Sequence, residues 1–379
     1  MLSKELEAYA VEAAPKTLEL LRELCAIPAP SHHEEFRAEY VRKWFEENGG
    51  ENVTVDAALN VICPVNVTEN NDLVVIMAHT DTVFPDRTPY AFREDEEKVY
   101  CPAVCDDTAN LSVLLMAAGY FLRKKMNPKT GILFVANSCE EGLGDLKGSK
   151  QIVRDYGQRI KEFISFDGED FGSIVSEAVG SHRYKVKVKT EGGHSFGAFG
   201  NRNAIRCLAS MIETFYSVKV PVEGESRTTY NVGTISGGTS VNTIAQEAEM
   251  LYEYRSDNRH CLAKMQDIFE KVIEAYRATG IEVEVEKVGD RPCTGEVDEG
   301  RMAALHEKIF AANREIGEES FFRSGSTDAN IPLSQGIPAA TIGVVIGEGC
   351  HTREEWLDKS SILPGLRKAL SILSNYYEV

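Results

Sequence analysis

Three near-continuous apolar runs, each ending in titratable side chains, constrain the fold of this chain more than any other feature. They are DLVVIMAH, which ends at His79, GILFVANSCEE, which ends in Glu140 and Glu141, and EFISFD, which ends in Asp167. Unbroken apolar strands that alternate with helices are typical of a mostly parallel sheet covered by helices on both faces. Because reactive groups gather at the carboxyl ends of such strands, we expect these four side chains at one edge of the sheet.

The residue pattern changes near residue 178. SHRYKVKVK alternates between polar and apolar positions, which is typical of a strand with one solvated face. The elements that follow have the order β-α-β-β-α-β of a ferredoxin-like unit, and from about residue 293 the earlier pattern resumes. The sequence therefore predicts a discontinuous α/β domain of residues 1–177 and 293–379, interrupted by an α+β insertion of residues 178–292.

Composition narrows the classes of partner. The formal net charge of the 379 residues is -18 at pH 7, which gives binding to nucleic-acid phosphates no electrostatic support. We expect no membrane partner either, because no apolar stretch approaches the length of a membrane span. The amphipathic N-terminus lacks the pattern of a signal peptide, and the nine cysteines contain no CxxC pair. These features predict a cytoplasmic protein.

Further titratable residues accompany the strand ends. Asp81 follows His79 by two positions and is placed to hold the second imidazole nitrogen, as a metal-binding histidine requires. Asp106 and Asp107 precede a buried helix, where such a pair is ordinarily a helix cap, and His351 follows another apolar run. Two histidines and several carboxylates from separate strand ends nevertheless match a two-metal site for zinc or a similar ion.

Seven motifs carry a family resemblance. They are, in order, HTDTV, DDTAN, CEEG, FDGED, GGHSFG, SGSTDAN and CHT. With them the chain resembles the M20 family of dinuclear zinc metallopeptidases over essentially its whole length, and it is most similar to peptidase T-like members. The resemblance implies a zinc-binding α/β domain and an inserted lid or dimerisation domain, which in turn implies a homodimer.

The resemblance also implies a role for each residue near the metals. Glu140 would be the general base that takes a proton from the attacking water, and Asp81 would orient His79. The ligands of the two zinc ions, for which cobalt or manganese are alternatives, would be His79 and Asp167 on one ion, Glu141 and His351 on the other, and Asp106 on both.

Five more residues would contact the substrate by resemblance. His194 would stabilise the oxyanion or grip the substrate, and Asn242 and Arg255 would bind a substrate carboxylate or carbonyl group. Gly325 and Ser326 lie in a glycine-rich loop that would contact the peptide backbone. The residues alone allow plainer interpretations, namely a histidine in a turn, a turn asparagine and an arginine in a surface ion pair.

These assignments predict a metal-dependent hydrolase that cleaves an amide bond of short peptides, foremost a tripeptidase-like aminopeptidase. An N-acyl amino acid deacylase or related amidohydrolase is the alternative, because it would use the same site residues. A non-catalytic metal-binding protein would need the ligands but not the base. The presence of Glu140 beside the ligands therefore favours an enzyme.

Two smaller predictions concern neighbours of the site. Ser31 and Glu34 have the spacing of a capping box, which predicts a helix start there. Cys105, Cys139 and Cys350 each immediately precede a candidate site residue. We interpret them as small buried hydrophobes, with competition for the metals as the alternative.

Overall fold

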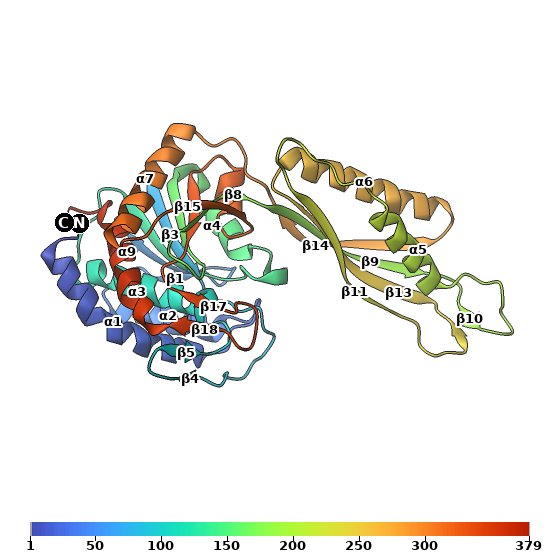
Figure 1. Cartoon of the computed structure of the whole chain (residues 1–379), viewed down its shortest axis with the longest axis horizontal. Helices are drawn as coiled ribbons and strands as arrows, with labels where there is room; N and C mark the ends of the chain where they lie inside the picture. The colour runs from blue at the N-terminus through green and yellow to red at the C-terminus, as the bar shows by residue number, and fades with distance from the viewer. Residues whose placement is uncertain (1, 379) are drawn as a thin grey trace. The chain divides into compact units, whose positions relative to one another are not determined.

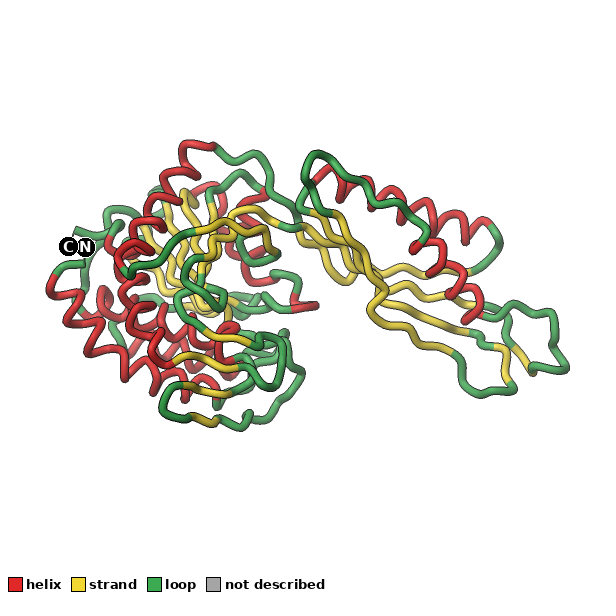
Figure 2. Tube along the Cα trace, viewed as in Figure 1, coloured by secondary structure: helices red, strands yellow, loops and turns green. Residues whose placement is uncertain are grey.

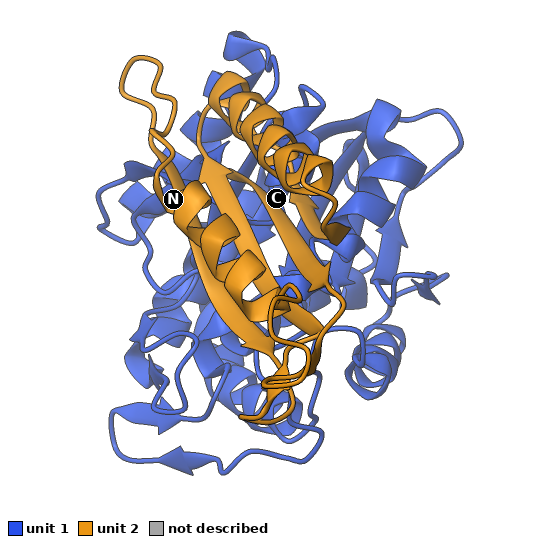
Figure 3. Cartoon of the chain, turned by 90° about the vertical axis from the view of Figure 1, so that its right-hand side faces the viewer, with its two compact units in different colours: residues 1–178, 295–379 blue, residues 179–294 orange. Residues whose placement is uncertain are grey.

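The computed structural model of the protein describes residues 2–378. It divides the chain into two compact units (Figure 3), here named unit 1 (Met1–Ala178 and Gly295–Val379) and unit 2 (Val179–Thr294). The divisions fall at 178/179 and 294/295, where the sequence predicts 177/178 and 292/293. None of the helices between residues 2 and 378 combines the length and the apolar character that crossing a bilayer requires.

Unit 1 is built on an eight-stranded sheet with the order β1-β2-β6-β3-β7-β16-β8-β15. The strands β6, β3, β7 and β16 at its centre are parallel, as are β8 and β15. The strand bounds are β1 Thr54–Val55, β2 Val61–Val65, β3 Leu73–His79, β6 Gly131–Asn137, β7 Ile160–Phe166, β8 Ser173–Ala178, β15 Phe321–Gly325 and β16 Ala339–Ile342. The prediction of a mostly parallel sheet is confirmed.

Helices cover both faces of this sheet (Figure 1). Val74 and Ile76 of β3 pack into a core that includes residues of α1, α3 and α9, whereas Val75 and Met77 pack into a second core with residues of α4 and α8. Both faces of β3 are therefore dry, which explains its unbroken apolar sequence. The helix bounds are α1 Lys4–Cys25, α2 Glu35–Glu47, α3 Asn110–Arg123, α4 Lys147–Tyr156, α7 Glu299–Glu315, α8 Asn330–Ser334 and α9 Ile362–Ser374.

Two short features of unit 1 shape the site. A small antiparallel sheet has the order β17-β18-β5-β4, with bounds Gly347–Glu348, Trp356–Asp358, Lys98–Tyr100 and Arg93–Glu94. The wide turn η1, Val104–Ala109, leads into α3. It contains Asp106 in a non-helical conformation and a cis peptide bond between Asp106 and Asp107.

The predicted capping box is wrong. The helix α2 begins at Glu35, and the residue before it, Glu34, makes no side-chain cap. Instead the Ser31 hydroxyl donates to Asp81, 2.7 Å away, and the buried carboxylate of Glu34 accepts the N–H of Cys139 at 3.0 Å. The side chains of Ser31 and Glu34 thus bind residues far along the chain in place of the first N–H groups of α2.

Unit 2 is an antiparallel four-stranded sheet with two helices on one face (Figure 2). The strand order β11-β13-β9-β14 is that of a ferredoxin-like unit. The bounds are β9 Gly180–Lys189, α5 Ala204–Tyr216, β11 Thr228–Gly237, β13 Glu247–Ser256, α6 Arg259–Ala278 and β14 Glu282–Arg291. A separate pair, β10 (Gly193–His194) and β12 (Thr243–Ile244), lies beyond one end of the sheet.

Candidate metal centre

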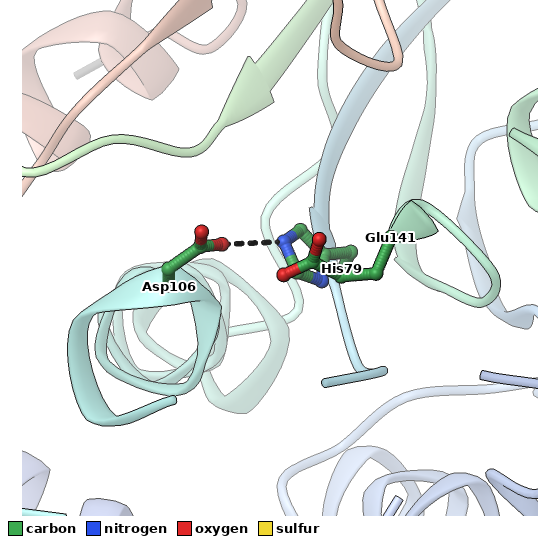
Figure 4. A group of neighbouring side chains, drawn as sticks. All are labelled: His79, Asp106 and Glu141. Atoms are coloured by element: carbon green, nitrogen blue, oxygen red, sulfur yellow. Dashed lines mark hydrogen bonds and ion pairs between the residues drawn. The ribbon is translucent and has the colours of Figure 1, made fainter. Parts of the chain in front are cut away.

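His79, the last residue of β3, is held at both ring nitrogens. Its Nε2 lies 3.0 Å from Oδ1 of Asp106 (Figure 4), and its Nδ1 lies 3.1 Å from the carbonyl oxygen of Asp81 and 3.4 Å from the Asp81 carboxylate. Its backbone N–H donates to Asp107 at 2.8 Å. Burial alone would lower the pKa of His79, but the carboxylates of Asp107, Asp106 and Asp81 raise it well above its ordinary value. Asp81 therefore holds Nδ1 in place, and Nε2 faces the carboxylate of Asp106.

Asp106 lies between two histidines. One carboxylate oxygen faces His79, and the other lies 3.1 Å from Nε2 of His351. The same His351 nitrogen lies 3.3 Å from Oε2 of Glu141. Burial would raise the pKa of Asp106, but His351 and His79 lower it below its ordinary value. An Asp that presents each oxygen to a different histidine has the arrangement expected of a ligand shared by two cations.

Asp81 also fixes the backbone of the adjacent glutamates. Its buried carboxylate accepts the N–H of Glu140 at 2.9 Å and the N–H of Glu141 at 3.0 Å, besides the Ser31 hydroxyl. Sequence reasoning predicted only a contact of Asp81 with His79. The structure therefore gives Asp81 a second task, because one carboxylate positions the end of β3 and the turn after β6 together.

The carboxylates are crowded enough to favour a cation. Burial and the neighbouring Asp106 raise the pKa of Glu141 to about 7, and the same two causes raise the pKa of Asp167. Within residues 2–378, Oε1 of Glu141 and Oδ1 of Asp107 are buried without a hydrogen-bond partner. Ligand atoms lie within 4.8 Å of one another in two groups, His79 with Asp106 and Glu141, and His79 with Asp107 and Asp167. Carboxylates and imidazoles of this kind fit divalent cations such as zinc.

The second group differs from the resemblance in one ligand. It places Asp107 beside Asp167 and His79, where the resemblance implies Asp106. Asp107 also accepts the His79 backbone N–H through Oδ2, which leaves Oδ1 directed elsewhere. Both members of the aspartate pair thus face the centre, and neither caps α3.

Sequence reasoning missed two buried glutamates. Glu355 accepts three backbone N–H groups of the segment that contains Asp106, and Glu34 accepts the Cys139 N–H. Both side chains are fully buried. No local signal identifies Glu355, because it follows the exposed Glu354 in an ordinary charged stretch. Only the tertiary fold separates the two.

The cysteines beside the site act as hydrogen-bond donors. The Cys139 thiol lies 3.2 Å from Oε1 of Glu34, and the Cys350 thiol lies 3.1 Å from Oε2 of Glu169. Burial and the nearby Glu34 raise the pKa of Cys139. A protonated thiol that donates to a carboxylate is a poor metal ligand, which disfavours competition for the metal. Cys105 and Cys139 are buried as predicted, whereas Cys350 is only half-buried.

His194 and Asn242 lie beside each other in unit 2. The pairing of β10 with β12 sets His194 opposite Thr243, and the N–H of Ser195 donates to the Asn242 carbonyl at 2.9 Å. Both side chains are exposed. The structure thus brings these two candidate substrate residues together.

Arg255 lies at the other end of the same unit. It is near the end of β13, opposite Ser181, and its guanidinium contacts Glu253 at 2.9 and 3.1 Å. The eight steps along β13 from Glu247 to Arg255 span about 27 Å at about 3.4 Å per residue. Because Glu247 pairs with Lys189, five residues before His194, Arg255 and His194 lie toward opposite ends of unit 2.

Gly325 is the last residue of β15 in unit 1 and pairs with Ala178 at the end of β8, and Ser326 follows it. Gly325 and Ser326 are both half-buried. Two residues later Asp328 is buried, accepts from the Asn137 amide at 2.6 Å, and has its pKa raised to about 7 by burial and by Glu140. The loop that contains Gly325 and Ser326 therefore leads directly to Asp328, which lies close enough to Glu140 for the two charges to interact.

Comparisons with known proteins identify the family and the fold. The model of Peptidase family M20/M25/M40 matches residues 75–375. The fold is similar to that of aminopeptidase PepT from Bacillus cereus ATCC 10987, with a TM-score of 0.70 and 22% identity over 96% of this chain and 98% of that one. It is also similar to a tripeptidase from Staphylococcus aureus subsp. aureus Mu50, with a TM-score of 0.74 and 23% identity over 96% and 98%.

A relative with a different named activity is also similar in sequence. It is a succinyl-diaminopimelate desuccinylase from Rickettsia typhi, 23% identical over 53% of this chain and 57% of its own length. The family match covers most of the chain, including every residue of the candidate metal centre. The protein is a hydrolytic enzyme that belongs to peptidase family M20/M25/M40.

Proposed function

We propose that the protein is a dinuclear metal aminopeptidase that hydrolyses the amide bond of short peptides, with tripeptides as the foremost substrates. The different surroundings of Glu140 and Glu141 carry this proposal. Glu141 belongs to a ligand group with His79 and Asp106, whereas neither ligand group in residues 2–378 includes Glu140. In this proposal Glu141 binds the metals and its neighbour Glu140 acts as the base.

The chain's own side chains supply the metal ligands in this proposal. Two bound divalent cations would polarise the amide carbonyl and acidify water. Zinc suits a mixture of imidazole and carboxylate ligands, and cobalt or manganese would accept the same set. The proposed ligands are His79, Asp106, Glu141, Asp167 and His351.

Glu140 would move the proton. Its carboxylate takes a proton from the attacking water and delivers it to the departing amine. Glu140 is only 7% exposed, and the hydrogen bond from its backbone N–H to Asp81 fixes its position in the turn that follows β6. Asp81 meanwhile keeps Nδ1 of His79 as the donor, so that Nε2 is free to bind a metal.

The Glu140→Gln variant tests this division of roles. It keeps the size of the side chain and the backbone bond to Asp81, so it should bind the same number of metal ions as the wild type while hydrolysis falls by about 10²–10⁴-fold. The control is Glu354→Gln, which changes an exposed glutamate of the His351 segment and should keep full activity. Retained turnover in Glu140→Gln would contradict its role as the base.

A panel of substrates tests the reaction class. Di- and tripeptides with a free amino terminus should be cleaved faster than N-acetyl and N-succinyl amino acids. The similarity to a desuccinylase supports a second candidate, an N-acyl amino acid deacylase with the same metal centre. Cleavage of the blocked substrates alone would replace the aminopeptidase by this second candidate.

We further propose that the enzyme works as a homodimer in the cytosol. Arg255 and His194 lie toward opposite ends of unit 2, where β13 alone spans about 27 Å from Glu247 to Arg255, so we infer that a second copy supplies one of the two residues at each site. Unit 2 would then serve as the lid and dimerisation domain. The nine free cysteines suit a reducing compartment.

Mixing two inactive variants tests the dimer. If the copies exchange His194, a dimer of one His194→Ala chain and one Arg255→Ala chain has one intact site and one doubly altered site. Random mixing should therefore restore about one quarter of wild-type activity. If one copy supplies both residues, the mixture stays inactive.

A further inference from the structure

Glu355 joins two segments that carry proposed ligands. It lies four residues after His351, and its fully buried carboxylate reaches across to the turn that contains Asp106. Oε2 accepts the N–H of Ala103 at 2.8 Å, and Oε1 accepts the N–H groups of Cys105 at 2.7 Å and of Asp106 at 2.9 Å. One side chain thus holds three backbone donors of a neighbouring segment.

The turn needs an external acceptor because its backbone is irregular. Ala103 has a φ of 59°, and Asp106 has a φ of -107° and a ψ of 90°, so these residues do not form regular helical hydrogen bonds. Buried N–H groups without a partner cost about 1–3 kcal/mol each. The carboxylate of Glu355 accepts all three and thereby fixes the backbone from which the Asp106 side chain extends.

The direction of the Asp106 carboxylate depends on that backbone. Its two oxygens lie 3.0 Å from His79 and 3.1 Å from His351, so a small rotation of the carboxylate would change both contacts. Because Glu355 belongs to the segment that carries His351, it sets the spacing between Asp106 and His351 directly. His79, on β3, is positioned separately by Asp81.

We propose that Glu355 is a positioning residue that sets the affinity of the cation held by Asp106, Glu141 and His351. The inference rests on the proposed pair of metal ions. It assigns Glu355 no contact with substrate. A carboxylate is required because each of its oxygens accepts a hydrogen bond, whereas a glutamine would turn its NH₂ group toward one or two of the N–H donors.

Calorimetric titration of the metal-free full-length protein with zinc tests this role. In Glu355→Gln the ion held by Asp106, Glu141 and His351 should bind about 10–100-fold more weakly, as for other residues that orient ligands. The other ion shares only Asp106 with that set and should weaken less. Activity of the variant should recover as free zinc is raised. A purely structural defect would not give that recovery.

Glu162→Gln is the matched control. Glu162 lies near the start of β7, where both of its oxygens lie 2.6 Å from Nζ of Lys308. Its change removes strong hydrogen bonds in the same unit, so the fold should lose stability while both zinc affinities stay at the wild-type values. Glu355→Asp keeps the charge but is too short to reach all three donors, and it should weaken the same ion.

The outcomes separate this inference from the proposed function. Unchanged zinc binding in both Glu355 variants would overturn the positioning role, as would equal weakening of both ions. In either case the proposed function would still be supported if the wild type binds two ions and the Glu140→Gln variant loses activity. A wild type that binds fewer than two ions would overturn both.

Discussion

Arg37 offers a quantitative test of how β3, the strand that ends in His79, is held against α1. Its guanidinium is 1% exposed and donates to the carbonyls of Leu24, Ile27 and Thr80 at 2.6–3.0 Å. The first two carbonyls lie at the end of α1, where regular helical hydrogen bonding stops, and Thr80 directly follows His79. Arg37 therefore connects α1 to the end of β3 that carries His79.

The cost of removing this tie can be worked from the contacts. Arg37→Met leaves the carbonyls of Ile27 and Thr80 without this donor, at about 1–3 kcal/mol each, whereas the Leu24 carbonyl keeps the N–H of Ile27. The change also removes a buried charge, which offsets part of the loss. We expect the free energy of unfolding to fall by about 2–4 kcal/mol, a large share of the total of about 5–15 kcal/mol. Arg37→Lys should lose about half as much, because an ammonium group cannot reach all three acceptors.

Urea unfolding followed by tryptophan fluorescence measures this loss selectively. The chain has two tryptophans, Trp44 on α2 and Trp356 on β18, and both lie in unit 1. The matched control is Arg42→Met on the same helix, whose partly exposed ion pairs with Glu39 and Glu46 should contribute about 0–1 kcal/mol. If Arg37→Met costs no more than Arg42→Met, the reasoning from buried acceptors is refuted.

Three further predictions concern pH, the metal anchor and packing. Burial lowers the pKa of Lys368 from 10.5 to about 7, so above pH 7 the unfolded chain binds a proton that the folded chain has lost, and stability rises with pH by about 1.4 kcal/mol per unit. Urea unfolding of wild type and Lys368→Met should therefore shift by about 2.7 kcal/mol in favour of the wild type between about pH 7.5 and 9.5, and a constant difference would contradict the assignment. Asp81→Asn should weaken zinc binding by about 10–100-fold in calorimetry, because its amide would oppose one of the two backbone N–H donors, and wild-type affinity would exclude this anchoring role. Gly365→Ala places a methyl carbon 1.8 Å from the Val344 carbonyl oxygen and should lower the free energy of unfolding by about 3 kcal/mol, measured against Gly197→Ala, where the added carbon meets nothing within 4 Å; equal stabilities would refute the clash.

The sheet could be predicted from the sequence because its central strands are buried on both faces. The residues Leu73–His79 and Gly131–Asn137 are buried throughout, so their apolar runs carry an unambiguous signal. The side chains at the ends of these runs meet for a geometric reason, since parallel strands end at the same edge. His79 and Glu141 were found in this way.

The supporting residues could not be predicted, because their roles depend on contacts far along the chain. Glu355 and Glu354 are the same residue type at adjacent positions, yet one is buried under the Asp106 turn and the other is exposed. Glu34 has the spacing of a helix cap, but the backbone of Cys139 takes its carboxylate. Local patterns identify elements and their ends, whereas the partners of a buried charge are set by the assembled fold.

The two ends of unit 2 have a consequence for how such enzymes diversify. Its first and last strands, β9 and β14, are neighbours, and Ser181 is paired with Arg291. Antiparallel partners lie about 4.5–5.5 Å apart, so the chain enters and leaves the insertion at nearly the same point. A genetic exchange of residues 179–294 for another insertion, or for a short linker, would preserve the path of the chain through unit 1. Unit 2, which carries His194 and Arg255, can therefore be replaced in evolution without a change in the residues of the candidate metal centre in unit 1.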